Sequence, residues 1–220
     1  MMLNRWAVSI IGTVFLAMFA ASAIGFALVP GGASIPVHYD INGVADRFAG
    51  PMEAFLMLPA CGAFVMIVTV IAVRAEPRKA NLERGRTVLS ATITAAMLLL
   101  GAIHVATVAT ALGYEVDIPA LVTLGVALIF VITGNLMPKT RPNFTVGVRT
   151  RWTLESERSW RLTHLWAGRA FVALGIATLA ASLIAPKVAM LVIILGTLGL
   201  TAAAMYLSWH WWRSDPARAQ

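Results

Sequence analysis

The sequence has little that could hold a soluble fold together. Its 220 residues include one cysteine, Cys61, so an intramolecular disulfide and a cysteine-rich metal site are excluded. Charged residues make up 12% of the chain, about half the roughly 25% of soluble domains, and hydrophobic residues make up 59%. A soluble domain has too little interior to bury that many apolar side chains, and a disordered chain is far more polar. The composition therefore predicts an integral membrane protein, with Cys61 as a small buried apolar residue.

Six apolar runs are long enough to cross a membrane, because a helix spanning about 30 Å of hydrocarbon needs roughly 20 residues. They comprise residues 6–29, 54–73, 88–112, 118–137, about 170–185 with a helical lead-in, and 188–212. The first is unbroken for 24 residues, longer than the roughly 7–15 residues of a signal-peptide core, so we expect a retained span. The expected fold is an all-α integral membrane protein, a single polytopic domain over residues 1–220 with six transmembrane helices.

The positive charges lie almost entirely on one side of this six-span layout. With the N-terminus in the cytoplasm, 15 of the 17 lysines and arginines fall in cytoplasmic segments, and Arg47 and Lys187 fall outside. Loops rich in lysine and arginine stay in the cytoplasm, so we expect both termini there. The formal charge of +7 therefore reflects topology rather than nucleic-acid binding.

Residues 30–51 form the one sizeable loop on the expected outer side. Apolar residues alternate at positions 35, 37, 39 and 41 and lead into Asn42-Gly43, which is typical of a β-hairpin whose two turn residues both have positive φ. A two-residue turn pairs residues 41 and 44, 39 and 46, and 38 and 47. In that register His38 and Asp46 point to opposite faces, so a metal site would need a longer loop or a bulge.

We therefore expect no metal at this loop, and we interpret it as a surface for an extracellular ligand or as a loop fixed by polar contacts. The candidate ligand-binding residues on this side are His38, Asp40, Gly43, Asp46 and Arg47.

Residues 138–169 form a basic loop on the expected cytoplasmic side. Thr153 is placed to cap a helix with Glu155 and Glu157 in its first turn. Tryptophans are interspersed with arginines beyond it, which favours an interfacial amphipathic helix running into the fifth span. Composition favours lipid anchoring over docking of a cytoplasmic protein, and direct nucleic-acid binding is the weakest interpretation.

His104 is the one titratable residue deep in a span, where polar groups are costly. A hydrogen bond to Thr107 or to another helix is favoured over a proton relay, because no second intramembrane base or carboxylate accompanies it. In the fifth span a stripe of Ala173, Ala177 and Ala181 is expected to allow close helix contact. The common catalytic motifs are absent, so we expect neither catalysis nor a cofactor.

The stretch from Gly134 to Leu154, continued by residues 160–164 and by Gly168-Arg169, resembles the signature of the SdpI family of bacterial membrane immunity proteins. Residues 35–47 are similar to a small domain of unknown function often found at the N-terminus of such proteins, although Phe48-Ala49-Gly50-Pro51 departs from its usual Gly-Ser-Lys-like ending. The resemblance implies a docking surface for a partner or ligand on the signature loop, made of Asn135, Pro138, Lys139, Pro142, Asn143, Gly147, Arg149, Thr150, Trp152, Thr153, Trp160, Thr163 and His164.

What the resemblance implies about function is an immunity protein and receptor in a bacterial cytoplasmic membrane. The family's namesake protects its producer from a secreted peptide toxin, and when occupied by toxin it holds a cytoplasmic repressor at the membrane. The expected partners are membrane lipids, a toxin outside and a repressor inside. Two alternatives stay open: a small-molecule or peptide transporter with a cavity near His104, and a membrane enzyme with a pocket around Asn143, Arg149 and His164 at the inner leaflet.

Overall fold

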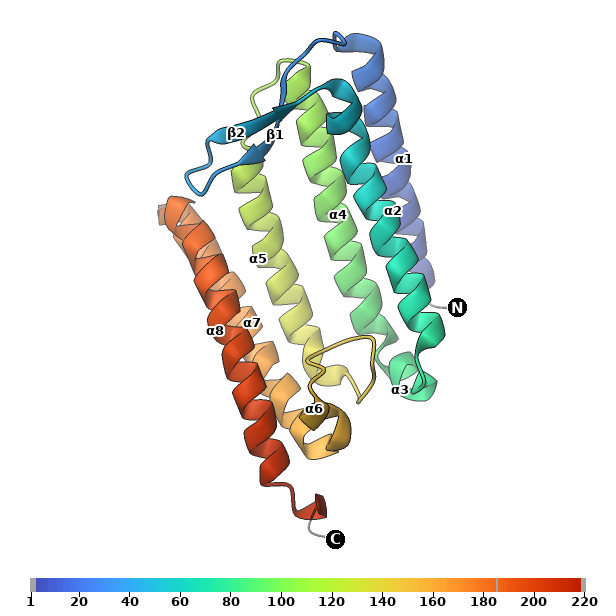
Figure 1. Ribbon diagram of the computed structural model, residues 1–220, viewed down its shortest axis with the longest axis vertical. Coiled ribbons are helices and arrows are strands. Elements are labelled where there is room, and N and C mark those ends of the chain that lie inside the picture. Colours follow the sequence, from blue (N-terminus) through green and yellow to red (C-terminus); the bar gives the residue numbers. More distant parts are fainter. Residues whose placement is uncertain (1–2, 185, 219–220) are drawn as a thin grey trace.

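Six long helices dominate the computed structural model, which describes residues 3–184 and 186–218 (Figure 1). Each is long and apolar enough to cross a membrane. They match the six predicted spans, with ends that differ by a few residues and with a fifth helix that begins well before residue 170. Their bounds are α1 Arg5–Leu28, α2 Pro51–Ala75, α4 Arg86–Ala111, α5 Ile118–Leu136, α7 Glu157–Ile184 and α8 Pro186–Arg213.

Short elements connect these helices at the two ends of the bundle. A two-stranded antiparallel sheet joins α1 to α2 and confirms the predicted hairpin. The stretch of residues 137–156, called the signature loop below, joins α5 to α7 at the opposite end, so the predicted loop 138–169 is already helical from Glu157 onward. The short elements are β1 Ile35–Tyr39, β2 Ala45–Ala49, α3 Lys79–Arg84, the 3-10 turn η1 Met137–Lys139, α6 Arg151–Glu155 and the 3-10 turn η2 Pro216–Arg218.

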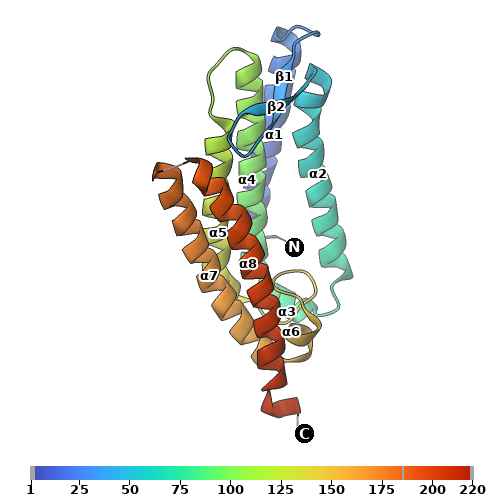
Figure 2. The same cartoon turned by 60° about the vertical axis from the view of Figure 1, so that its left-hand side comes forward.

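The long helices form two groups of three. Helices α1, α2 and α4 pack together, as do α5, α7 and α8, with α7 between its two neighbours; the groups meet along α4 and α5 (Figures 1 and 2). Both ends of the chain lie toward the signature loop and away from the hairpin (Figure 1). We call the two ends of the bundle the hairpin end and the loop end.

Apolar side chains cover the outside of the bundle as well as its inside. Leu16, Phe64 and Leu195 are each at least 64% exposed. Soluble monomers do not expose apolar surface along whole helices, so these faces suit hydrocarbon. Cys61 also lies on the exposed face of α2, so the expectation that it is buried in the protein was wrong.

His104 ties the first helix group together. Its Nε2 lies 2.9 Å from the Ser22 hydroxyl and 3.1 Å from the Met18 carbonyl on α1, and Ser22 donates to the Phe55 carbonyl of α2 at 2.8 Å. The expected partnership with another helix is confirmed, whereas Thr107 bonds its own helix at Ile103. The Nε2 is thus satisfied by α1, and Ser22 extends the contact to α2, whereas the buried Nδ1 has no hydrogen-bond partner among the described residues.

Helices α5 and α7 approach closely through glycines. A Cβ on Gly168 would lie 2.6 Å from the Gly134 carbonyl oxygen, and one on Gly175 would lie 2.7 Å from the Ala127 carbonyl oxygen. The predicted contact through Ala173, Ala177 and Ala181 was wrong, because the first two of these residues are exposed and the third is half-buried. The small residues that matter lie seven apart on the other face of α7.

Substituting Gly168 with alanine is expected to push α5 and α7 apart, because the new methyl group meets backbone rather than a mobile side chain. Overpacking of this kind costs about 1–3 kcal/mol, so Tm in detergent should fall by several degrees. The matched control is Ala173→Leu on the exposed face of the same helix, for which a change within about 0.5 kcal/mol is expected. Equal shifts for both variants would show that the glycine contact does not hold the helices together.

Candidate functional site

The hairpin has a longer turn than the sequence predicted. The Gly43 N–H donates to the Asp40 carbonyl at 2.9 Å, and the Asp40 N–H donates to the Val44 carbonyl at 2.8 Å, so three residues form the loop. Gly43 has a φ of 80°, but Asn42 does not have positive φ, contrary to the expectation for a two-residue turn. This is a type I turn followed by a left-handed glycine, the usual geometry of three-residue hairpin loops.

The Asp40 carboxylate selects this turn. Its Oδ1 accepts the N–H groups of Asn42 and Val44, both at 2.8 Å, which satisfies loop donors that the strands cannot reach. The pKa of Asp40 is lowered, first by the hydrogen bond from the Asn42 side chain and then by the Val44 amide. The ionised side chain is therefore part of the loop geometry.

The strand register also differs from the prediction. His38 pairs with Arg47 as expected, but Tyr39 pairs with Ala45, so Asp46 bulges out of β2. A bulge re-aims side chains, and the His38 Nδ1 lies 2.6 Å from the Asp46 Oδ1. The expected separation of His38 and Asp46 on opposite faces was therefore wrong. Beyond this pair, no cluster of three or more metal-ligating side chains is found among the described residues.

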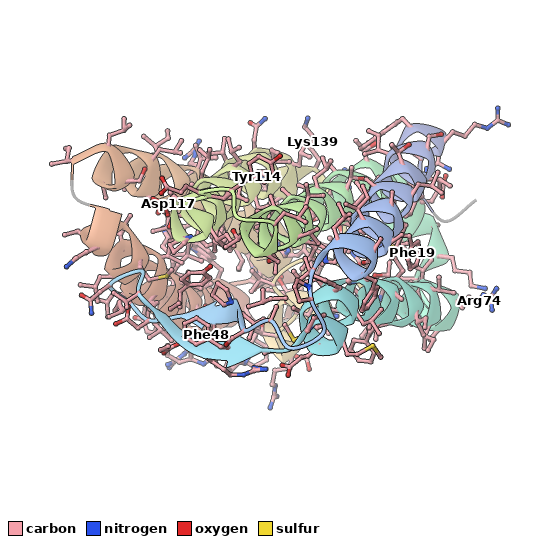
Figure 3. The ribbon with its side chains drawn as sticks, turned by 90° about the horizontal axis from the view of Figure 1, so that it is seen from above. Phe19, Phe48, Arg74, Tyr114, Asp117 and Lys139 are labelled. Atoms are coloured by element: carbon pink, nitrogen blue, oxygen red, sulfur yellow. The ribbon has the colours of Figure 1, made fainter. Side chains whose placement is uncertain are left out.

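The hairpin roofs a cavity of about 220 Å³ at its end of the bundle. Seen from above in Figure 3, the strands lie between α2 and α8. The cavity walls come from β1 and from four helices; the apolar lining includes Val37, Met57, Leu58, Ile103, Val122 and Met190. Tyr39 also lines the cavity, and its burial raises the pKa of its phenol.

A second hollow of about 190 Å³ adjoins the first beneath the hairpin tip. The tip residues Asn42 and Gly43 face Asp117 and Pro119 at the start of α5 and Lys187 at the start of α8. The hairpin belongs to the first helix group but reaches the second here. Of the predicted outer residues, Asp40 and Gly43 line this hollow, His38 lines the first cavity, and Arg47 pairs with Glu53.

At the loop end, Glu76 anchors the signature loop to the end of α2. Its side chain is 2% exposed. Its Oε2 accepts the Phe144 N–H at 2.8 Å and the Thr145 hydroxyl at 2.6 Å, and its Oε1 accepts the Arg78 N–H at 2.9 Å. This role was not predicted, because the only signal in the sequence is one acidic residue between an apolar run and Pro77.

Asn143 shapes the turn that Glu76 holds. Its Oδ1 accepts the N–H groups of Thr145 and Val146 at 2.8 and 2.7 Å, and its amide donates to the Arg141 and Val146 carbonyls at 2.7 and 3.2 Å. Pro142, which precedes it, is buried, and its carbonyl accepts the Asn81 side chain at 2.8 Å. Asn143 is fully buried and uses its whole side chain inside the loop.

His164 and Trp160 hold the other side of the loop. The Val148 N–H donates to the His164 Nε2 at 3.0 Å, so this nitrogen carries no proton; the Nδ1–H then donates to the Trp160 carbonyl at 2.8 Å. The two rings stack with centroids 4.0 Å apart. Gly147 has a φ of 115°, and a Cβ there would lie 2.2 Å from the His164 Nε2, so only glycine fits.

Thr150, and not Thr153, caps the helix that follows. The Thr153 N–H donates to the Thr150 hydroxyl at 3.2 Å, and the Thr150 N–H donates to the Thr153 hydroxyl at 3.0 Å. This reciprocal pair is a capping box. The helix α6 ends at Glu155, so the predicted continuous helix with Glu155 in its first turn was wrong, although Glu157 does lie in the first turn of α7. Thr150 also donates to Ser208 of α8 at 3.0 Å.

The predicted docking residues thus divide by accessibility. Asn143, Thr153, Trp160, Thr163 and His164 are almost fully buried, and all of them except Thr163 form hydrogen bonds with the signature loop. Those at the surface are Asn135, Pro138, Lys139 and Arg149, and Trp152 is half-buried. Arg149 donates to the Phe144 carbonyl, which holds its guanidinium against the loop. The geometry brings the loop residues together and leaves Asn135 apart on α5.

Removing the Glu76 carboxylate is expected to release the signature loop. Glu76→Ala leaves three partly buried donors without an acceptor. Hydrogen bonds to a charged group contribute about 1.5–3 kcal/mol each, so we expect a loss of about 3–5 kcal/mol. Tm in detergent and trypsin cleavage after Arg141 and Arg149 measure this. The control is Glu83→Ala, which removes an exposed ion pair with Arg86 and should cost at most about 1 kcal/mol. Unchanged cleavage in Glu76→Ala would contradict the anchoring role.

These features define a class of protein: a multi-pass membrane protein whose signature loop is fastened by buried polar side chains to both helix groups. Residues 139–208 match the SdpI/YfhL protein family. The chain is also 24% identical to Immunity protein SdpI of Bacillus subtilis (strain 168) over 195 residues, which cover 89% of this chain and 90% of that protein. The matches confirm the resemblance to the SdpI family. No solved structure matches the chain significantly.

Proposed function

We propose that this chain is an immunity protein that protects a bacterial cell from a secreted, membrane-active peptide toxin. The observation that carries the proposal is its similarity to Immunity protein SdpI along 89% of its length. In the proposed orientation the loop end faces the cytoplasm, because 15 of the 17 lysines and arginines then lie inside. The hairpin then faces outward, where a toxin arrives.

The hairpin end suits recognition of an amphipathic peptide. Its cavity is walled by apolar side chains, and its rim carries the polar residues Asp40, Asp117 and Lys187. Pockets of this composition bind ligands through apolar contact and use a few polar groups for orientation. The test is survival of a toxin-sensitive strain that lacks its own immunity gene, with and without this chain, when challenged with medium from toxin-producing cells.

Protection should depend on the hairpin turn. Gly43→Val places a β-branched residue at a φ of 80° beside Pro119, which strains the turn and shifts the tip. We expect survival to fall at least about tenfold, since a strain of about 1–3 kcal/mol corresponds to roughly that loss of affinity. Membrane abundance, measured by immunoblot, should be unchanged.

Gly32→Val is the matched control, because Gly32 lies in the same loop with open space around it and without positive φ. It should protect like the parent chain. Full protection by Gly43→Val would exclude this loop as the sensor without excluding immunity itself.

The proposal includes capture of a cytoplasmic repressor at the loop end when toxin is bound. Arg149 supports this role, because its guanidinium is exposed yet held by the Phe144 carbonyl. A fixed guanidinium presents a planar pair of donors to a carboxylate, which lysine cannot reproduce. Arg151 lies two residues away with its guanidinium 5.8 Å from the Trp212 ring centroid, a contact that lysine can keep.

We therefore expect Arg149→Lys to abolish reporter induction or protection at normal membrane abundance, and Arg151→Lys to retain both. Both substitutions conserve charge, so attraction to anionic lipid alone would tolerate them equally. If both substitutions are tolerated equally, the loop acts as a lipid anchor and Arg149 is not part of a partner site.

The alternatives have less support from the geometry. A transporter needs a polar path to the midplane, but His104 is fully buried and its Nε2 is hydrogen-bonded to Ser22 and Met18. An enzyme at the inner leaflet needs free polar groups, but Asn143 and His164 are committed to the backbone of the signature loop. The Bacillus subtilis relative is named as an immunity protein, which supports the same interpretation.

A further inference from the structure

A basic cleft of about 470 Å³ opens at the loop end, beside the signature loop. Its first wall is the segment that follows α5, and its second wall is the first turns of α7. Trp160 lines the inner part, where its indole donates to Thr140 at 3.2 Å. The charged residues that line it are Lys139 and Arg141 on the first wall, and Glu157, Arg158 and Arg161 on the second.

The basic side chains of the cleft are not neutralised by neighbouring carboxylates. Four cationic side chains line it, against one carboxylate. Within residues 3–184 and 186–218, none of the four cationic head groups makes a hydrogen bond or an ion pair with another side chain. Like charges around one hollow repel each other, so the arrangement favours an anion between the walls. The three guanidiniums are suited to a phosphate, which they bind through paired N–H groups.

The position of the cleft indicates where such a phosphate comes from. Met137–Lys139 follows directly after the last turn of α5, so Lys139 stands where an apolar span ends, and Figure 3 shows it at the edge of the bundle. Lipid headgroups lie at this depth, and basic pockets between helices on the cytoplasmic side bind them. A protein partner would need a broad surface of about 800 Å² rather than a hollow of this size.

We propose that this cleft binds the phosphate headgroup of an anionic phospholipid, one phosphate-bearing lipid held between the two basic walls. The site extends beyond the proposed immunity function and rests on neither a toxin nor a repressor. It would fix the start of α7, and with it the signature loop, relative to the membrane surface.

Native mass spectrometry of the full chain released from phosphatidylcholine nanodiscs containing a small fraction of cardiolipin tests the proposal. Arg158→Gln with Arg161→Gln should lower the affinity of the single bound cardiolipin by at least about tenfold, since each charge-assisted hydrogen bond contributes more than a neutral one. Lys139→Gln with Arg141→Gln, on the facing wall, should do the same. All four side chains are exposed, so Tm should hold.

Arg74→Gln with Arg84→Gln is the matched control, because it removes the same charge from exposed positions at the loop end outside the cleft. It should change affinity by less than about threefold if attraction is localised. Equal losses in all three variants would replace the site by diffuse attraction to the membrane. Displacement of cardiolipin by excess inorganic phosphate would make it a soluble-phosphate site, and preferential displacement by poly-glutamate would make it an acidic-protein site; either result overturns the proposal.

Discussion

The loop end depends on the hydrogen bonds of Glu76, because a charged carboxylate is costly to bury unless donors surround it. Three donors meet this need, and two of them belong to the signature loop, 68 and 69 residues further along the chain. The loop is thereby fastened to the first helix group although it connects two helices of the second. Val146 adds an apolar contact in the same direction, since it packs on the cluster that contains Leu82 and Leu89.

The hairpin makes the reciprocal connection at the opposite end. It joins two helices of the first group, but its tip lies over the starts of α5 and α8, where Gly43 approaches Pro119 and the tip residues share a hollow with Lys187. Each group therefore sends one segment across to the other, at opposite ends of the bundle. Apart from these segments the groups meet chiefly along α4 and α5, so a change in their relative position must alter the hairpin and the signature loop together.

The parts of this structure that follow from local pattern were predictable. The lengths of the apolar runs located the six helices, and the alternation of apolar and polar residues located the hairpin, because both patterns involve residues close together in the sequence. The turn geometry was missed because the Asp40 side chain competes with the two-residue turn that Asn42-Gly43 usually forms. Asp46 also bulges out of β2, which local alternation does not reveal, and its carboxylate lies next to His38.

Contacts between distant segments could not be read in the same way. Nothing in the sequence around Glu76 indicates that Phe144 and Thr145 are its hydrogen-bond partners. By residue size alone, Ala173 is as suitable for close helix packing as Gly168. Many residues of the family signature proved to be internal: Gly147 leaves room for His164, and Asn143 closes its own turn. A signature therefore marks residues needed to build the loop as well as any that meet a partner.

This distinction bears on how the proposed receptor would transmit a signal. A ligand beneath the hairpin acts on both helix groups at once, and a partner at the signature loop does so at the opposite end. If occupancy of one end favours one arrangement of the groups, the other end binds more tightly in that arrangement, and linkage requires the two effects to be equal in free energy. The buried anchors make such coupling physically reasonable, because a loop that was loosely attached would absorb the movement, whereas one fixed at Glu76, His164 and Ser208 must move with the helices that hold it.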